Sequence, residues 1–267
     1  QSMQTLFLIL LILLATSLAP TFSKPTQKPS RKHSHKPSRK PTRKPTKKKM
    51  KRPSTASNAD KVIACKYIGT SDLKECFNVT DVVVHRSAIQ IPTQIGLLNN
   101  LKSLQISYSS GKLPSFMGHL TKLTLLSLSH NQLTGKIPSF LGSLTKLTLL
   151  DMTANKMTGP IPSFMGSLSK LKFLALSLNQ LTGNIPSSMG SLTKLNDLFL
   201  WSNQLTGTIP SSIGSLTSLQ FLFLHSNKLT GTIPPSFGSL TNLQYLLLYD
   251  TQLSGSMPAS VCSFGLT

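Results

Sequence analysis

Residues 195–218 read LNDLFLWSNQLTGTIPSSIGSLTS, and this 24-residue pattern decides the fold. Five copies run without a gap from residue 123 to residue 242, and a sixth copy begins at Leu243. Two shorter copies of 22 residues begin at Val79 and Leu101. Eight units at a nearly fixed period predict a solenoid, because each unit can bury its apolar side only against its neighbours.

The spacing within one unit predicts its local structure. Leucine at repeat positions 1, 4 and 6 indicates a short strand whose positions 4 and 6 point inward. Positions 3, 5 and 7 then point outward, and we call the surface that they form the outward face. The segment Leu-Thr-Gly-x-Ile-Pro predicts a second extended piece, and Ser-x-x-Gly-x-Leu then turns the chain back. Position 9 is an asparagine that can bond backbone groups at the bend after the strand: Asn131, Asn155, Asn179, Asn203 and Asn227.

The complete pattern, L-x-x-L-x-L-x-x-N-x-L-x-G-x-I-P-x-x-h-G-x-L-x-x with h apolar, resembles the plant-type leucine-rich repeat. Repeats of this type occur in ectodomains of plant receptor kinases, in polygalacturonase-inhibiting proteins and in secreted algal proteins. The resemblance covers residues 79–267. It implies an α/β-type solenoid, a curved right-handed superhelix of about eight repeats with a parallel sheet on its concave face. It also implies binding rather than catalysis, and it names no ligand.

An apolar segment near the amino terminus predicts export. Residues 6–14 are apolar, and small residues follow them. The run is shorter than the ~20 residues that a membrane span needs, so it fits a secretory signal peptide within residues 1–23. No Lys or Arg precedes the run, which departs from the usual signal-peptide pattern. A retained signal anchor is the alternative. We therefore expect a secreted or extracellular protein, with the cell wall as one candidate location.

Residues 24–60 form a basic arm and linker. The chain has a net charge of +21, and 14 of its 28 Lys and Arg residues lie between Lys24 and Arg52. Like charges, prolines and the lack of apolar residues predict an extended, disordered segment. It is either a solvated stalk or a tether to an anionic wall or matrix polymer. The predicted export argues against nucleic acid as its partner, and a membrane partner would require a segment outside this chain. The residues predicted to bind the polyanion are Lys47, Lys48, Lys49, Lys51 and Arg52.

Residues 61–78 precede the first strand, where a solenoid needs a cap. The resemblance implies that Cys65 and Cys76 form the disulfide of this cap, in line with export. Asn78 begins a glycosylation sequon. Cys262 is the odd cysteine, so we expect either that it pairs with a cysteine beyond Thr267 in a longer protein or that it is a buried free thiol.

The outward face changes character along the chain. Its side chains are small or polar, with two leucines, in the first repeats, and rings dominate in the last four. Exposed apolar surface of this kind usually marks a binding site, although the rings could also merely pack on one another. Asp197 and Asp250 could orient a ligand by accepting hydrogen bonds. The seven rings, which we call the aromatic patch, are Phe173, Phe199, Trp201, Phe221, Phe223, Tyr245 and Tyr249. The predicted ligand-binding residues are these rings together with Asp197 and His225.

Two further columns recur once per repeat. Lys122, Lys146, Lys170 and Lys194 form a basic stripe that is either a solvated face or an extension of the polyanion site. The second column is Thr134, Thr158, Thr182, Thr206 and Thr230. A regular threonine array could match an ice lattice, or it could simply follow the consensus of the repeat.

No catalytic motif is present in the sequence. We find no G-x-S-x-G, no H-E-x-x-H, no phosphate-binding glycine loop and no cysteine pair with metal spacing, so we expect no enzyme, no metal site and no cofactor. The expected function is an extracellular recognition module that binds a protein, a peptide or a polysaccharide through the aromatic patch. The alternatives are a structural protein of the cell wall or extracellular matrix, and an ice-binding protein.

Overall fold

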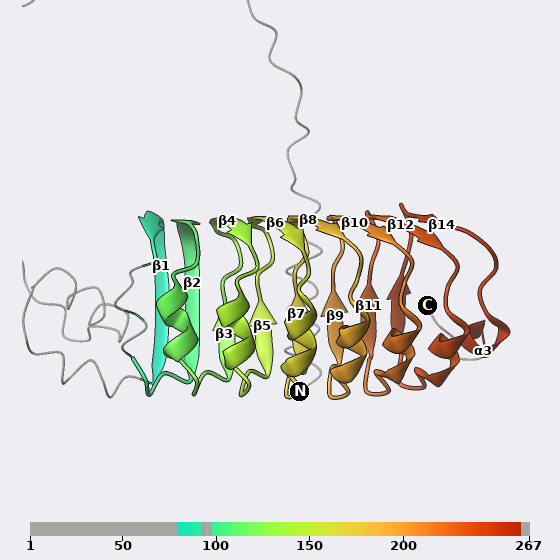
Figure 1. Cartoon of the computed structure of the whole chain (residues 1–267), viewed down its shortest axis with the longest axis horizontal. Coiled ribbons are helices and arrows are strands. Elements are labelled where there is room, and N and C mark those ends of the chain that lie inside the picture. Colours follow the sequence, from blue (N-terminus) through green and yellow to red (C-terminus); the bar gives the residue numbers. More distant parts are fainter. Residues whose placement is uncertain (1–79, 92–94, 96–97, 263–267) are drawn as a thin grey trace, which may run out of the picture. The chain divides into compact units, whose positions relative to one another are not determined.

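The computed structural model describes residues 80–262, apart from residues 92–94 and 96–97. Within this part the repeats stand side by side in one row, with the strands of successive repeats parallel (Figure 1). The repeats form one compact unit. The architecture confirms the predicted leucine-rich repeat solenoid.

Each repeat contributes its leucine-rich strand to a first parallel ladder. Leu126 pairs with Leu150, and Leu150 pairs with Leu174, so equal repeat positions lie opposite each other. This register stacks the inward leucines into a continuous hydrophobic core. The strands of this ladder are β1 (Asp81–Gln90), β2 (Ser103–Gly111), β3 (Leu125–Ser127), β5 (Leu149–Asp151), β7 (Phe173–Ala175), β9 (Asp197–Phe199), β11 (Phe221–Phe223) and β13 (Tyr245–Leu247).

The predicted second extended piece forms a second parallel ladder, which joins the first through the far end of β2. Its register differs, because Thr206 pairs with Lys228 rather than with the next threonine. Equal repeat positions are therefore offset by two residues between neighbouring strands. The strands are β4 (Gln132–Lys136), β6 (Lys156–Pro160), β8 (Gln180–Gly183), β10 (Gln204–Gly207), β12 (Lys228–Gly231) and β14 (Gln252–Leu253).

Short 3-10 helices return the chain to the start of the next strand, and each follows a proline in extended conformation. In the later repeats these helices approach closely, since a Cβ built on Gly214 would overlap the carbonyl oxygen of Ser236. A Cβ on Gly142 would instead meet the side chain of Phe164 at 3.1 Å. The helices are η3 (Ser115–His119), η4 (Ser139–Ser143), η5 (Ser163–Ser167), η6 (Ser187–Ser191), η7 (Ser211–Ser215) and η8 (Pro235–Ser239), followed by α3 (Ala259–Cys262).

A buried asparagine joins each of the five repeats from residue 123 to residue 242 to the repeat before it. The side chain of Asn203 accepts a hydrogen bond from the backbone N–H of Leu181 at 3.0 Å. Its Nδ2 donates to the carbonyl oxygens of Leu176 and Leu200, both at 3.0 Å. Ser202, with φ of 53°, turns the chain just before it. These bonds confirm that the asparagines satisfy backbone groups where the strand ladder ends.

Several predicted features lie outside the described residues. They are the signal peptide, the basic arm and the cap with Cys65, Cys76 and Asn78. Cys262 closes α3, but its side chain also lies outside the described part. Over the residues that are described, no helix combines the length and the hydropathy that a membrane span requires.

The asparagine bonds lead to a stability prediction. Asn203→Ala leaves the buried N–H of Leu181 without a partner and removes one of the two asparagine hydrogen bonds that the Leu176 and Leu200 carbonyl oxygens each accept, so we expect the free energy of unfolding to fall by roughly 2 kcal/mol. Chemical denaturation of the purified repeat protein measures this change. Gln204→Ala is the matched control, because Gln204 is exposed, and its unfolding midpoint should stay near that of the wild type. Equal stability of the two variants would contradict a structural role for the asparagine.

Candidate functional site

Strand alternation places the aromatic patch on the side of the first ladder away from the core. Along β9 and β11, the core cluster includes Leu198 and Leu222 but not Phe199 or Phe223. Parallel register brings equal positions of neighbouring strands together, so Phe199 and Phe223 are direct partners. The side of the sheet that the sequence predicted for these rings is therefore confirmed.

The rings form ladders from repeat to repeat. Phe199 and Phe223 stack with centroids 4.8 Å apart, and Phe221 stacks on Tyr245 at 5.2 Å. At position 7, the ring of His225 lies between Trp201 at 5.3 Å and Tyr249 at 4.4 Å. These separations match the ~4.8 Å spacing of hydrogen-bonded strands, so the register itself produces the stacks.

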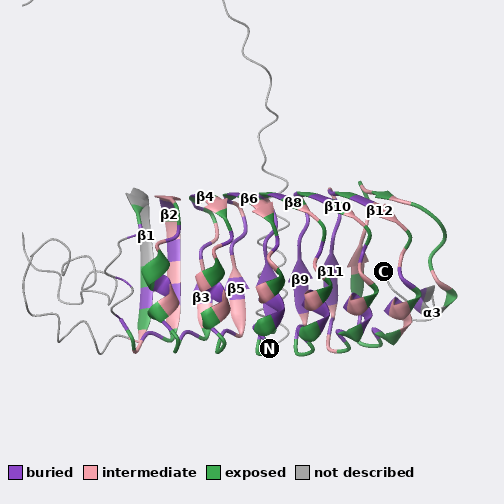
Figure 2. Cartoon of the chain, in the orientation of Figure 1, coloured by how far each residue is buried: buried purple, intermediate pink, exposed green. Residues whose placement is uncertain are grey.

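The rings are less exposed than the sequence predicted. Outward side chains of β7, β9 and β11 are buried, whereas those of β3 and β5 are partly exposed (Figure 2). Stacking accounts for part of this burial, because each ring covers the face of the next while leaving its edges open. The prediction of one exposed patch is thus wrong for five of the seven rings: Phe173, Phe199, Trp201, Phe221 and Phe223. It holds for Tyr245 and Tyr249, which are 40% and 61% exposed.

The same face holds buried polar atoms that have no hydrogen-bond partner. Among the described residues, these atoms are Ser177 Oγ, Asp197 Oδ1 and His225 Nδ1, and all three side chains occupy outward positions of β7 to β11 or the residues just after them. The sequence prediction included Asp197 and His225 but missed Ser177. The sequence does contain an indication of Ser177, because Ser177 occupies the same repeat position as Trp201 and His225 in the next two repeats. Burial without a partner costs free energy, which a ligand with complementary groups would recover.

Burial shifts the pKa values of both titratable groups. Desolvation raises the pKa of Asp197 from 3.8 to about 6. For His225, desolvation lowers the pKa from 6.5 to about 4, against a smaller raising effect of the Asp250 carboxylate. Near neutral pH the face therefore presents a carboxylate on β9 and a neutral imidazole after β11.

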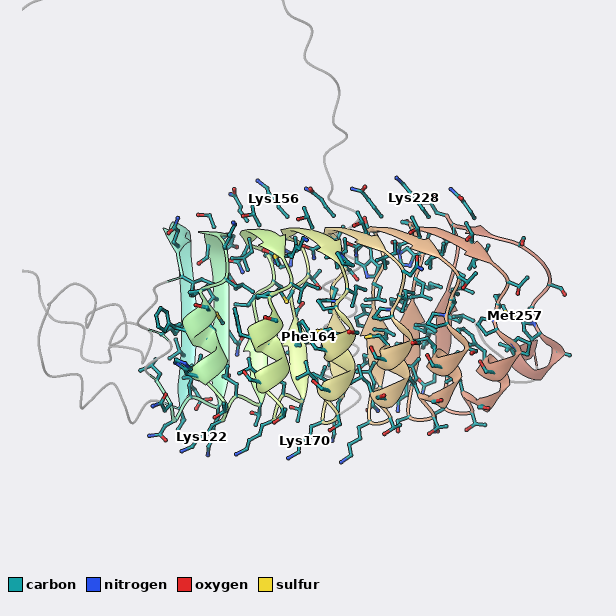
Figure 3. All side chains as sticks on the ribbon, in the orientation of Figure 1. Lys122, Lys156, Phe164, Lys170, Lys228 and Met257 are labelled. Carbon is teal, nitrogen blue, oxygen red and sulfur yellow. The ribbon has the colours of Figure 1, made fainter. Side chains whose placement is uncertain are left out.

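Charged side chains elsewhere lie at the edges of the sheet. Figure 3 shows Lys122 and Lys170 along the edge where the 3-10 helices lead into the next strand, and Lys156 and Lys228 along the opposite edge. The predicted polyanion-binding residues of the arm lie outside the described part of the chain. Within residues 80–262 as described, no cluster of three or more His, Cys, Asp or Glu side chains could hold a metal ion.

The two shifted groups predict opposite effects of pH on stability. The folded protein holds a proton on Asp197 more tightly than the unfolded chain, so this contribution to stability is complete below about pH 3.8 and is lost as the pH rises through about 6. The folded protein disfavours the proton on His225, so that contribution is present above pH 6.5 and is lost as the pH falls through about 4.

Asp197→Asn should therefore stabilise the protein at pH 7 by about 2–3 kcal/mol, with the gain shrinking toward pH 4. Denaturant unfolding at several pH values measures the difference between variant and wild type. Asp151→Asn is the control, since the Asp151 side chain is only partly buried and its Oδ1 already accepts a hydrogen bond from the Thr153 N–H at 3.0 Å. A difference that does not change with pH would contradict the desolvation of Asp197.

Models of leucine-rich repeat families match three adjoining parts of the chain. A model described as leucine rich repeat matches residues 193–253, and one described as leucine rich repeats in two copies matches residues 121–164. A third, also a leucine rich repeat, matches residues 170–192. No curated protein sequence matches the chain.

Solved structures with the same fold come from plant receptors and from an ice-binding protein. The TDR receptor is 34% identical with a TM-score of 0.70, and the match covers 73% of this chain and 35% of the receptor chain. The ectodomain of the Arabidopsis receptor kinase HAESA, in complex with an IDA peptide hormone, is also 34% identical, with a TM-score of 0.66 and coverages of 70% and 32%. A plant ice-binding protein is 28% identical, with a TM-score of 0.55 and coverages of 70% and 69%.

The chain thus spans about a third of the length of these receptor ectodomains. Its leucine register, asparagine ladder and proline-led 3-10 helices agree with the family matches along residues 121–253. Together these observations show that the chain belongs to the plant-type leucine-rich repeat family.

Proposed function

We propose that the repeats form an extracellular recognition module that binds a peptide or a protein through the outward face of β7 to β13. The observation that carries this proposal is the set of unpartnered polar atoms of Ser177, Asp197 and His225, gathered among stacked rings on one side of the sheet. Rings supply contact area, and polar atoms without partners supply positions for directed hydrogen bonds. The HAESA ectodomain, which has the same fold, binds a peptide hormone.

The rings are better explained by binding than by stability alone. The core is already continuous through the leucines on the other side of the sheet, and Trp201 and Phe223 do not belong to it. A leucine at these positions would suffice for packing on the sheet, as at Leu125 and Leu149 in earlier repeats. Tyr245 and Tyr249, which are 40% and 61% exposed, offer a ligand an exposed point of first contact.

The basic arm completes this proposal as a tether. Residues 24–60 would retain the module on an anionic wall or matrix polymer, which is where a secreted ligand would be met. A polysaccharide remains a second ligand class for the aromatic patch itself, since ring faces also stack on sugars. Selecting peptides that bind the repeats and measuring their affinities distinguishes a peptide ligand from a polysaccharide ligand.

The proposal predicts a loss of affinity when rings are removed. Trp201→Ala combined with Phe223→Ala should weaken a peptide selected from a display library by at least roughly 30-fold, because buried rings at interfaces commonly contribute about 2 kcal/mol. Calorimetry with the purified protein measures the affinity. Tyr249→Ala serves as a second variant, since Tyr249 is exposed and its loss should spare the fold.

Phe116→Ala is the matched control, because Phe116 is an exposed ring on η3 rather than on the outward face. Its affinity should equal that of the wild type. Unchanged affinity of the folded double variant and of Tyr249→Ala would show that the ligand binds elsewhere.

We propose ice binding as a second candidate function, through the second ladder. Thr134, Thr158, Thr182 and Thr206 are exposed, one per strand, along β4 to β10. The similarity to a plant ice-binding protein, which reaches over 69% of that protein's length, supports this candidate function. The two functions use different sides of the repeats, so separate variants can distinguish them.

Ice binding predicts thermal hysteresis of the purified wild-type protein and its loss in Thr182→Lys with Thr206→Lys. Two lysines would interrupt the threonine row without entering the core, because both threonines are exposed. Thr193→Lys, at an exposed position outside the second ladder, should leave hysteresis unchanged. Absence of hysteresis in the wild type would exclude this function.

A further inference from the structure

Charge is sorted between the outward face and the edges of the repeats. Three of the four acidic residues in the described part occupy outward positions, namely Asp81, Asp151 and Asp197, and Asp250 directly follows Tyr249. No Lys or Arg occupies repeat positions 3, 5 or 7 from Ser103 to Tyr249. The repeat lysines occupy other positions, and those labelled in Figure 3, namely Lys122, Lys156, Lys170 and Lys228, lie along the two edges of the sheet. The outward face is therefore acidic, although the protein as a whole is basic.

Asp197 is the acidic group placed deepest within the aromatic patch. It pairs across the ladder with Phe173 on one side and Phe221 on the other, and Phe199 follows two residues later on the same face. The side chain is 6% exposed, and its Oδ1 accepts no hydrogen bond. The carboxylate thus lies among rings with an acceptor atom still unsatisfied.

We propose that the ligand of this face is an extended peptide that places an arginine or lysine side chain against Asp197 and apolar side chains against Phe199 and Phe223. This inference rests on the proposed function, because it assigns the chemistry of the ligand at the same face. A basic group would donate a hydrogen bond to Oδ1 and neutralise the buried charge. The neighbouring ring faces attract cations as well, so the phenylalanines add to the same preference.

Other ligand chemistries fit this arrangement less well. An acidic group would face Asp197 at close range without any basic side chain on the outward face to balance it. A quaternary ammonium could lie against the rings but would leave Oδ1 unsatisfied, since it has no N–H to donate. The patch spans four strands, β7 to β13, or about 15 Å at the usual strand spacing, which corresponds to an extended peptide of about four or five residues.

The neighbouring groups indicate how binding should respond to pH. On β7 the outward residues Phe173 and Ala175 do not titrate, and on β11 the nearest titratable group is His225, which stays neutral at and above pH 5. Burial raises the pKa of Asp197 to about 6, so its carboxylate becomes protonated as the pH falls from 7.5 to 5. A basic peptide should therefore bind more weakly at pH 5, while a neutral peptide should not.

The test compares four pools of acetylated, amidated hexapeptides that differ only at one fixed position. This position holds arginine, lysine, citrulline or glutamate, and the others hold a mixture of apolar and small residues. Citrulline has nearly the size and shape of arginine, but its ureido group is neutral and has a carbonyl oxygen in place of one NH2 group. Binding to the purified repeat protein is measured by fluorescence anisotropy at pH 7.5 and pH 5.

The wild-type protein should bind the arginine and lysine pools at least roughly tenfold more tightly than the citrulline pool, and glutamate most weakly. The preference should shrink at pH 5. In Asp197→Asn, the arginine, lysine and citrulline pools should bind alike at both pH values. Asp151→Asn should keep the wild-type preference, because the Asp151 carboxylate is already bonded to the Thr153 N–H.

The outcomes separate this inference from the proposed function. Suppose that the pools bind and that Trp201→Ala weakens their binding. If the arginine pool then binds no more tightly than the citrulline pool, or if its advantage persists in folded Asp197→Asn, a basic ligand at Asp197 is excluded. Recognition of peptides by the rings would remain. If no pool binds wild-type protein at any pH, peptide recognition itself fails, and this inference fails with it.

Discussion

The hydrogen bonds of one buried asparagine in each of the five 24-residue repeats from residue 123 to residue 242 are the interaction on which the rest of the structure depends. A leucine-rich strand ends after three residues in most repeats, and its last carbonyl groups would otherwise be buried without partners. Asn179, for example, donates to the carbonyl oxygens of Met152, Leu176 and Ser177 and accepts from the N–H of Met157. Because these partners belong to two successive repeats, the asparagine closes one turn and fixes the register of the next. That register aligns the leucines in the core and the rings on the outward face.

Bulky side chains change sides halfway along the repeats. In the earlier units a phenylalanine lies in the 3-10 helix, as Phe140 and Phe164 do, and the outward face carries small residues such as Ser127. In the later units serine replaces that phenylalanine, and Ser212 Oγ donates to the Ser187 carbonyl oxygen of the preceding repeat at 2.7 Å. The backbones of the helices in these repeats then approach each other closely, while rings fill the space over the strands. The candidate binding face lies in this second half because only there are rings stacked in consecutive repeats.

Much of this face could be predicted because successive side chains of a strand point to opposite sides of the sheet. Alternation assigned Phe199 and Phe223 to the side away from Leu198 and Leu222, and the core cluster confirms that assignment. Exposure could not be predicted in the same way, because it depends on how rings of different repeats cover one another and on what else packs there. Ser177 was missed for the same reason: the sequence shows that it shares a repeat position with Trp201 and His225, but only the structure shows that its hydroxyl is buried without a hydrogen-bond partner.

Sequence alone was sufficient for the repeat length, the two strands of each repeat and the family, because these follow from local spacing that recurs in every copy. It was also sufficient for the difference between the two halves of the outward face. Only the stacked repeats decided that Asp197 lies buried between Phe173 and Phe221 and that its pKa rises to about 6. Each of these residues is 24 positions from the next in the chain, and the parallel register alone brings Phe173 and Phe221 each within one strand spacing of Asp197. Burial and unsatisfied hydrogen bonds are properties of that shared surface, so no single repeat could reveal them.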